Sequence, residues 1–218
     1  MTRAVFRDLI AETPVIAAPM CGISDYPYRA ICREVGARLT YTQMVSAEAI
    51  WRGDRKTLEI LDLLGGEEPL AMQLFGGEPE ALAYAAGVLQ DLGAAVIDLN
   101  MGCPARKITV AHAGAALLRE PERVRRIFRA MRRVVRVPLT VKMRWDWDDG
   151  KQGEGAALSV MRMAEEEGLD GVCLHARTRE QGYSGAANWE LIARLREVAP
   201  AMPLIGNGDI RTPADALE

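Results

Sequence analysis

Short apolar runs alternate along the chain with longer stretches of helical spacing. The runs suit buried parallel strands, and seven are predicted: Val15 to Met20, Leu39 to Val45, Leu70 to Gly76, Ala95 to Gly102, Pro138 to Arg144, Gly171 to Arg177 and Pro203 to Asn207. Helices are predicted between them, for example Glu78 to Gly93 and Glu120 to Val135, each with a proline near its first turn. No linker interrupts the alternation, which favours one α/β domain over residues 1–218.

Polar and reactive side chains recur where the predicted strands end. They are Gln73, Asn100 with Cys103, Lys142 with Arg144, His175 with Arg177, and Asn207 with Asp209. A barrel brings all these ends to one face, whereas an open doubly wound sheet spreads them and uses only the crevice at its switch point. The pattern therefore predicts a (β/α)8 TIM barrel, of which about seven βα units are present.

The last residues have the signals of a helix start. Thr212 and Pro213 predict an N-cap and a first helical position, and Ala214 to Glu218 continue the helix. A complete barrel usually needs ~250 residues, and this sequence has 218. We therefore expect the eighth strand to be missing from it.

Composition is that of an ordinary globular protein. Hydrophobic residues make up 49% and charged residues 26%, and a net charge of −3 gives no overall basic field, so any contact with RNA must come from a local patch. No apolar stretch approaches the ~20 residues of a membrane span, and the first residues lack the apolar core of a secretory signal. We expect a cytoplasmic monomer with no membrane partner.

One of the four cysteines is a candidate for chemistry. Their wide spacing, without a CxxC pair, predicts neither a metal site nor a disulfide framework. Cys103 follows a predicted strand on an active-face loop, where a thiol can exchange a proton, although free cysteines are more often small buried hydrophobic residues. Cys32 and Cys173 are predicted in the core, and Cys21 fits either role.

Two neighbouring strands repeat a spacing of basic residues. Lys142 and Arg144 share one side of their strand, and His175 and Arg177 share one side of the next. Cations that point into a barrel mouth need anionic partners, such as a phosphate or an electron-rich reduced ring. The alternative is that the Lys142 and Arg144 side chains both extend to solvent.

The tripeptide Asn207, Gly208 and Asp209 ends the seventh predicted strand. A glycine here lets backbone N–H groups approach a phosphate closely, and barrels often build a phosphate site after strands seven and eight. The same tripeptide is also a common turn.

Two basic segments are candidates for RNA contact. In Arg119 to Arg136 the apolar residues follow helical spacing, so its arginines are expected to cover the solvent side of a barrel helix. Arg106 and Lys107 follow Cys103 on the active-face loop and are better placed to meet an RNA backbone.

Five motifs follow one another along the chain. They are APM at Ala18 to Met20, NMGCP at Asn100 to Pro104, VKMR at Val141 to Arg144, HARTREQGYSG at His175 to Gly185 and NGD at Asn207 to Asp209. These motifs resemble those of the tRNA-dihydrouridine synthases, most closely the bacterial B-type branch. The likeness runs from about Val15 to the last residue.

The resemblance implies a reaction in which NADPH reduces FMN, hydride passes to C6 of a flipped-out uridine in tRNA, and a cysteine thiol protonates C5. It implies that Cys103 is the acid. It implies the substrate contacts Asn100, Arg177, Arg106 and Lys107. It implies flavin contacts from Pro19, Met20, Cys21, Gln73, Lys142 and His175 at the ring and from Asn207, Gly208 and Asp209 at the phosphate.

The sequence departs from the family pattern in three places. Cys21 stands where the family commonly has Ala, and Ala111 and His112 stand where relatives often have more basic or glycine-rich sequence. The Gly-Arg phosphate clamp of strand eight and the C-terminal helical domain that grips tRNA are expected to be absent. A fragment of this kind would bind FMN weakly and tRNA poorly.

Two other functions remain open at this point. Another FMN barrel, such as a dihydropyrimidine or dihydroorotate dehydrogenase, would use nearly the same mechanism, but the motif order and the Arg106 and Lys107 pair favour a polynucleotide substrate. A non-catalytic RNA-binding barrel is disfavoured because Cys103, Lys142 and His175 are all present.

Overall fold

The computed structural model describes residues 2–12, 15–62, 69–148 and 155–217. From Leu70 to Asn207 strands alternate with helical segments as the sequence predicts. In chain order the elements are α1 (Thr2–Ala11), α2 (Tyr26–Glu34), β1 (Thr40–Tyr41), β2 (Val45–Ser46), α3 (Ala47–Trp51), α4 (Arg55–Asp62), β3 (Leu70–Phe75), α5 (Pro79–Asp91), β4 (Val96–Met101), α6 (Arg106–Thr109), the 3-10 helix η1 (Gly114–Arg119), α7 (Pro121–Val134), β5 (Leu139–Arg144), α8 (Ala156–Glu166), β6 (Gly171–His175), α9 (Glu190–Val198) and β7 (Leu204–Asn207).

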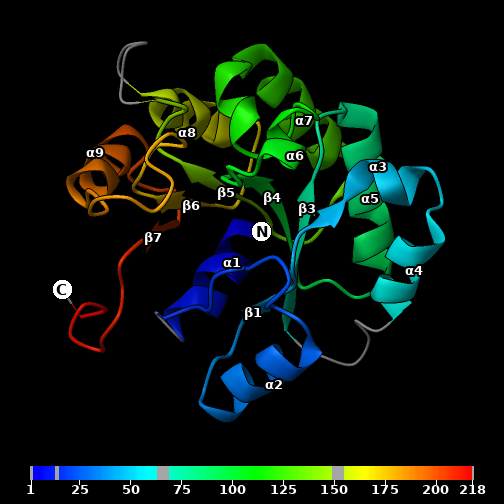
Figure 1. Ribbon diagram of the computed structural model, residues 1–218, viewed down its shortest axis with the longest axis horizontal. Helices are drawn as coiled ribbons and strands as arrows, with labels where there is room; N and C mark the ends of the chain where they lie inside the picture. Colours follow the sequence, from blue (N-terminus) through cyan, green and yellow to red (C-terminus); the bar gives the residue numbers. More distant parts are fainter. Residues whose placement is uncertain (1, 13–14, 63–68, 149–154, 218) are drawn as a thin grey trace.

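The strands form one parallel sheet in the order β1-β3-β4-β5-β6-β7, and β2 also pairs with β3. From β3 to β7 the helical segment after each strand returns the chain to the same end of the sheet, so each strand pairs with the next one along the chain. The sheet is curled, and α5, α7, α8 and α9 form an arc around its outer side (Figure 1). This architecture is a partial (β/α)8 barrel and confirms the predicted fold class.

The prediction of a first strand at Val15 to Met20 is wrong. These residues are irregular and have no strand partner among the described residues. Pro19 has no N–H to give to a ladder, and the Met20 N–H donates to Ser24 Oγ at 2.9 Å. The apolar run suits a strand locally, but a strand also needs a neighbouring edge, which the described chain does not bring to it.

The prediction of a helix after Thr212 is also wrong within the described residues. Thr212 Oγ1 does accept the Asp215 N–H at 3.3 Å, as an N-cap would. The chain then closes a turn, in which the Leu217 N–H donates to the Ala214 carbonyl at 3.0 Å. One turn fixes several dihedral angles for a single hydrogen bond, so it does not propagate without packing to support it.

Helix α1, which the sequence analysis did not predict, lies inside the curve of the sheet (Figure 1). Its Phe6 is fully buried and packs on Gly171, where an added Cβ would clash with the ring. Thr2 Oγ1 donates to Asp170 Oδ1 at 2.6 Å, and Arg3 donates to the Leu169 carbonyl at 2.7 Å. These contacts lie at the amino end of β6, so α1 covers the end of the barrel opposite the predicted site.

The arginines of α7 cover its outer side, as the sequence predicts. Arg125 pairs with Glu166 at 2.6 Å, and Arg129 pairs with Glu167 at 2.7 Å, so both connect α7 to the end of α8. The apolar side of α7 is buried and includes Val124, Ile127, Phe128 and Met131. These arginines therefore serve to hold neighbouring helices together.

Two features are absent from the part of the chain that the structure describes. It contains no helix that is long and apolar enough to cross a membrane. It contains no group of three His, Cys, Asp or Glu side chains that could hold a metal ion.

Candidate active site

The strand register brings the predicted site residues together at the carboxyl ends of the strands. Asn100 on β4 lies opposite Lys142 on β5, which lies opposite Cys173 on β6. His175 on β6 lies opposite Asn207 on β7. Side chains two residues apart on a strand share a face, so residues far apart in sequence surround the barrel mouth.

Asp98 is a buried acid in this site that the sequence analysis missed. Its carboxylate accepts hydrogen bonds from Gln73 Nε2 at 2.7 Å and from Thr140 Oγ1 at 2.5 Å. Burial raises the pKa of Asp98 to about 6, although these two hydrogen bonds and nearby Lys142 oppose the rise. An acid in an otherwise apolar strand, two residues before Asn100 and on the same face, was the sequence signal that could have identified it.

Asn100 anchors the loop that carries Cys103. Its Nδ2 donates to Gln73 Oε1 at 3.0 Å, and its Oδ1 accepts the N–H groups of Gly102 at 3.2 Å and Cys103 at 2.9 Å. The Asn100 amide therefore orients the loop. Its predicted contact with a uracil edge would have to use its remaining hydrogen-bonding capacity, and that contact stays a prediction.

Cys103 is half-buried at the start of this loop. Its carbonyl accepts the Ala115 N–H at 3.1 Å. Gly114 has a φ of 60°, and an added Cβ there would lie 2.8 Å from the Cys103 carbonyl oxygen. Asn100 therefore holds the N–H of Cys103 and the close approach of η1 holds its carbonyl, while Arg106 and Lys107 are exposed on α6 beside it.

His175 is a buried, neutral imidazole beside three cations. Burial, followed by Arg144, Lys142 and Arg177, lowers the pKa of His175 to about 3. An Arg177 N–H lies 3.3 Å from His175 Nε2, which must accept because a guanidinium can only donate. The other ring nitrogen, Nδ1, then carries the proton.

Arg177 is buried and already has protein partners. It pairs with Asp209 at 2.8 Å and donates to the Gly185 carbonyl at 2.5 Å. A backbone N–H from Ala187 and the Arg177 guanidinium lower the pKa of Asp209 to about 2. The structure gives Arg177 a role in fixing Asp209 and the loop around Gly185, and its predicted substrate contact stays untested.

Gly208 lies at a position where a side chain does not fit. Its φ is 125°, and an added Cβ would lie 2.7 Å from the Ala187 Cβ and 3.1 Å from His175 Cδ2. The next residue, Asp209, also has a positive φ of 60°. The tripeptide therefore forms a tight turn that packs closely against Ala187 and His175, and its predicted contact with a phosphate stays a prediction.

Arg144 does not extend to solvent, so the alternative of an exposed side chain is wrong for this residue. It is 1% exposed and donates to the carbonyls of Gly102 at 3.0 Å, Thr178 at 2.8 Å and Gly182 at 2.8 Å. Its guanidinium also lies 5.5 Å from the ring centroid of exposed Tyr183. Arg144 connects the Cys103 loop to the loop after β6.

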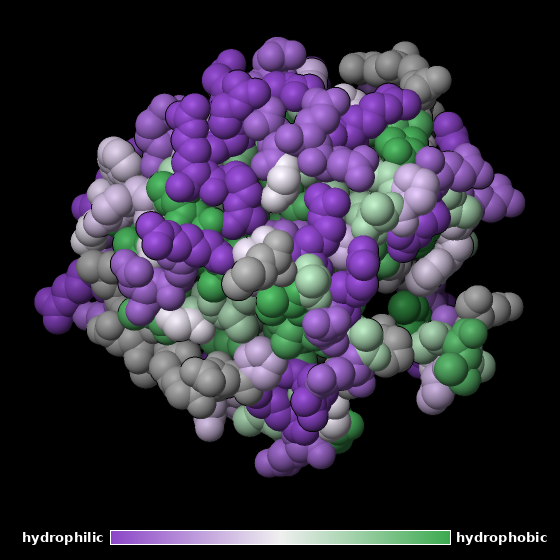
Figure 2. Space-filling view, turned by 180° about the vertical axis from the view of Figure 1, so that it is seen from behind, coloured by the Kyte–Doolittle hydropathy of each residue, from purple (hydrophilic) through white to green (hydrophobic). Residues whose placement is uncertain are grey.

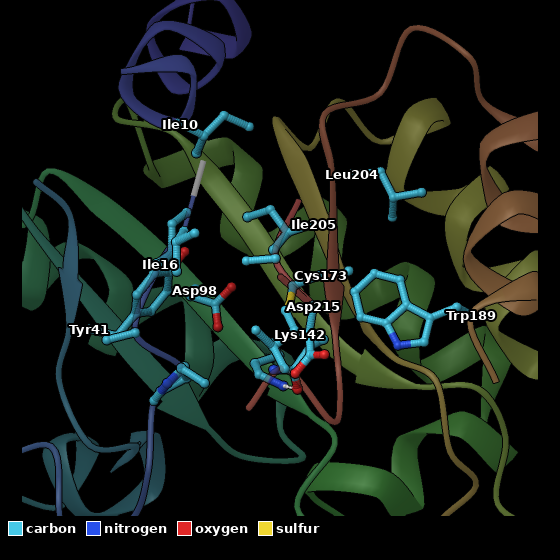
Figure 3. A pocket seen from close by; sticks show the side chains of 18 residues that line it. Ile10, Ile16, Tyr41, Asp98, Lys142, Cys173, Trp189, Leu204, Ile205 and Asp215 are labelled. Atoms are coloured by element: carbon cyan, nitrogen blue, oxygen red, sulfur yellow. Dashed lines mark hydrogen bonds between the residues drawn. The ribbon is translucent and has the colours of Figure 1, made fainter. Parts of the chain in front are cut away.

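A cavity of about 520 Å³ runs along the open side of the barrel. Figure 3 shows Asp98, Lys142 and Cys173 inside it, with Tyr41 and Ile16 on one wall and Trp189 and Leu204 on the other. Seen from behind, the mostly polar surface is hollowed next to the C-terminal segment (Figure 2). Ligand pockets typically measure ~300–1,000 Å³, so this cavity is large enough for a cofactor.

The cavity coincides only in part with the predicted cofactor residues. Pro19, Lys142 and Asn207 line it, and Lys142 Nζ donates to Asn207 Oδ1 at 2.9 Å. His175 lies opposite Asn207 and Gly208 follows it, but neither lines the cavity. Gln73 does not line the cavity either, and it donates a hydrogen bond to Asp98, which does. Met20 and Cys21 follow Pro19 in a turn, where Cys21 is exposed. The cavity-lining residues that were not predicted as site residues include Tyr41, Asp98, Cys173, Trp189, Ile205 and Gly206.

Solved structures of other proteins share this fold. Histamine dehydrogenase from a Rhizobium species matches with a TM-score of 0.65 at 15% identity over 91% of this chain and 40% of its own. A phosphonomutase described as putative, from Burkholderia cenocepacia, matches with a TM-score of 0.65 at 18% identity over 99% and 88% of the two chains. At such low identity these similarities support the barrel fold alone.

Curated relatives are much more similar in sequence. The chain is 40% identical to tRNA-dihydrouridine synthase B of Xanthomonas axonopodis over 94% of its length, and 40% identical to that of Pseudomonas aeruginosa over 93%. It is 39% identical over 94% to a probable tRNA-dihydrouridine synthase of Rickettsia bellii. It spans 60% of the first two relatives and 62% of the third. A sequence model described as "Dihydrouridine synthase (Dus)" matches residues 15–218, and the chain therefore belongs to the dihydrouridine synthase family.

Proposed function

We propose that this protein reduces uridine in tRNA to 5,6-dihydrouridine, with FMN as its cofactor and NADPH as its reductant. One geometric observation carries the proposal beyond family membership. Asn100 anchors the backbone of Cys103 at 2.9 Å and lies opposite Lys142, so the loop that carries the thiol begins beside the strand position that carries a cation. A proton donor and a site for electron-rich chemistry are what the reaction requires.

The described residues fit FMN. A cavity of about 520 Å³ has mainly apolar walls, with Lys142 and Asn207 on the side where the ring and the phosphate end are proposed to meet, and with the carboxylates Asp98 and Asp215 also in its lining. We assign the ring to Pro19, Met20, Cys21, Gln73, Lys142 and His175, and the phosphate end to Asn207, Gly208 and Asp209. When bound, FMN supplies the hydride that adds to C6 of the uracil ring.

The residues of the chain have separate tasks in this reaction. Hydride addition to the C5=C6 double bond leaves an electron pair at C5, and Cys103 gives its thiol proton to that carbon. The resulting thiolate regains a proton from water. The Lys142 ammonium would favour negative charge on the reduced flavin ring. Neutral His175 would contact the same ring without adding a further positive charge.

We assign tRNA binding to residues around the same opening. Arg106 and Lys107 are exposed next to Cys103, where they can neutralise backbone phosphates. Asn100 and Arg177 are the proposed contacts to the target nucleotide. A stacked base cannot reach the cavity, so the uridine has to leave the stack, at a cost of a few kcal/mol.

Cys103→Ala tests the proposal. We expect the purified variant to keep its flavin spectrum and its reduction by NADPH, but to form dihydrouridine in unmodified tRNA about 10² to 10⁴ times more slowly, the usual contribution of a general acid. Cys32→Ala, a substitution in α2, is the matched control and should form product normally. Normal product formation by Cys103→Ala would refute the acid role, and a protein that cannot be reconstituted with FMN would refute the flavin reaction.

Substrate choice distinguishes the proposal from a small-molecule flavin barrel. The unaltered protein should oxidise NADPH faster when unmodified tRNA is added, and free uracil or orotate should have no effect. Turnover of the free pyrimidine without a response to tRNA would identify a dehydrogenase of the dihydropyrimidine or dihydroorotate type.

A further inference from the structure

A chain of hydrogen bonds connects a buried carboxylate to the loop of Cys103. Gln73 Nε2 donates to Asp98 at 2.7 Å, and Asn100 Nδ2 donates to Gln73 Oε1 at 3.0 Å. The Cys103 N–H then donates to Asn100 Oδ1 at 2.9 Å. Asp98, Gln73 and Asn100 are all at most 9% exposed, so water does not compete readily for these groups.

The donor and acceptor of every hydrogen bond in this series follow from the groups at its two ends, the Asp98 carboxylate and the backbone N–H groups of the Cys103 loop. An ionised carboxylate only accepts, so Gln73 must turn its NH2 group toward Asp98 and its oxygen toward Asn100. Asn100 must then turn its NH2 group toward Gln73 and its oxygen toward the loop. The backbone N–H groups of Gly102 and Cys103 only donate, so this orientation alone satisfies them. A flip of either amide would place donors against donors.

We propose that Asp98 is a positioning residue that fixes the orientation of the Gln73 and Asn100 amides and thereby holds the backbone of the Cys103 loop. Its role in dihydrouridine formation rests on the proposed function, but its effect on the loop does not.

The surroundings of Asp98 keep the carboxylate ionised at neutral pH. Burial raises its pKa only to about 6, since Gln73, Thr140 and Lys142 stabilise the charge. The other titratable groups that face it are Tyr41 on β1 and Cys173 on β6, and burial raises the pKa of each, so both stay neutral. Lys142 on β5 is therefore the charged side chain that acts on the pKa of Asp98, and it lowers that pKa.

The first test is Asp98→Asn, followed by measurement of amide hydrogen exchange. The amide introduced at position 98 can offer either an oxygen or an NH2 group to Gln73, so the direction of these hydrogen bonds is imposed only from the loop end and no longer from position 98. We expect the Gly102 and Cys103 amides to exchange about tenfold faster, equivalent to losing about 1.4 kcal/mol of hydrogen-bond free energy. Iodoacetamide should also alkylate Cys103 faster, as quantified on its own peptide.

Thr140→Val is the matched control at pH 8. It removes the other hydrogen bond to Asp98 but leaves an acceptor-only carboxylate facing Gln73. Exchange at Gly102 and Cys103 should stay within about twofold of the unaltered protein. An equal acceleration in both variants would mean that any disturbance around Asp98 loosens the loop, and this result would overturn the proposal.

The double variant Asp98→Asn with Gln73→Glu supplies a rescue. It moves the carboxylate to position 73, where it accepts from the new amide at position 98 and from Asn100, so the Asn100 oxygen again faces the loop. We expect protection of the Gly102 and Cys103 amides to return, which loss of a structural contact would not predict. Failure of the double variant to restore protection would overturn the proposal.

The unaltered protein gives an independent measurement that requires no variant to fold. Protection of the Gly102 and Cys103 amides, corrected for intrinsic exchange, should fall as the pH is lowered through about 6, because protonated Asp98 can also donate. Constant protection between about pH 5 and 8 would overturn the proposal. Absence of dihydrouridine formation by the unaltered protein would contradict the proposed function while leaving these exchange results intact.

Discussion

Asp98 should make the protein less stable at neutral pH than in mild acid, relative to a variant that cannot ionise. Its ordinary pKa is 3.8, and burial raises its pKa in the folded protein to about 6. Below pH 3.8 the carboxyl group is neutral in both states. As the pH rises, the unfolded chain releases this proton first, so stability is lost until the folded protein also ionises near pH 6.

The magnitude follows from the size of this pKa difference. About two pKa units at 1.36 kcal/mol per unit amount to about 3 kcal/mol. We expect the free energy of unfolding of the unaltered protein, minus that of Asp98→Asn, to fall by about this amount between about pH 4 and pH 7. Groups such as Asp209, whose lowered pKa has the opposite effect, cancel because both proteins contain them.

Urea unfolding of both proteins, followed by circular dichroism at a series of pH values, measures this difference. The reasoning would be refuted by a difference that stays constant within about 0.5 kcal/mol across the range, because a buried carboxylate with a raised pKa must produce a slope. A slope of the opposite sign would mean that the hydrogen bonds from Gln73 and Thr140 stabilise ionised Asp98 more strongly than burial opposes its ionisation.

Two further predictions concern parts of the fold that support the site. Phe6→Ala should lower the free energy of unfolding by about 3 to 5 kcal/mol, because it empties a fully buried position against Gly171, and calorimetry should find a much smaller change for Val5→Ala, whose side chain is 47% exposed. Gly208→Ala should destabilise by about 1 to 3 kcal/mol more than Gly53→Ala. Both glycines have a positive φ, but a Cβ at Gly53 meets nothing within 4 Å, so an equal cost would contradict the clash with Ala187 and His175.

The site was predictable where side chains alternate along regular strands. Lys142, His175 and Asn207 were expected to lie together because strand ends converge in a barrel, and the structure does bring them together: His175 lies opposite Asn207, and Lys142 donates to Asn207. Asp98 was missed because a single acid in an apolar strand has no local sign of its partners. Gln73 lies 25 residues away in sequence, and Thr140 lies 42 residues away.

Sequence periodicity by itself determined the strands and helices from β3 to β7, the parallel sheet and the barrel face that carries the candidate site, because these follow from local patterns and from the geometry of the strand-helix repeat. Only the tertiary structure decided that the run from Val15 to Met20 has no strand partner among the described residues, that α1 covers one end of the barrel, and that Arg177 pairs with Asp209. Each of these outcomes depends on contacts between residues that are far apart in sequence. A local pattern fixes what a segment can form, and the packed fold fixes what it is paired with.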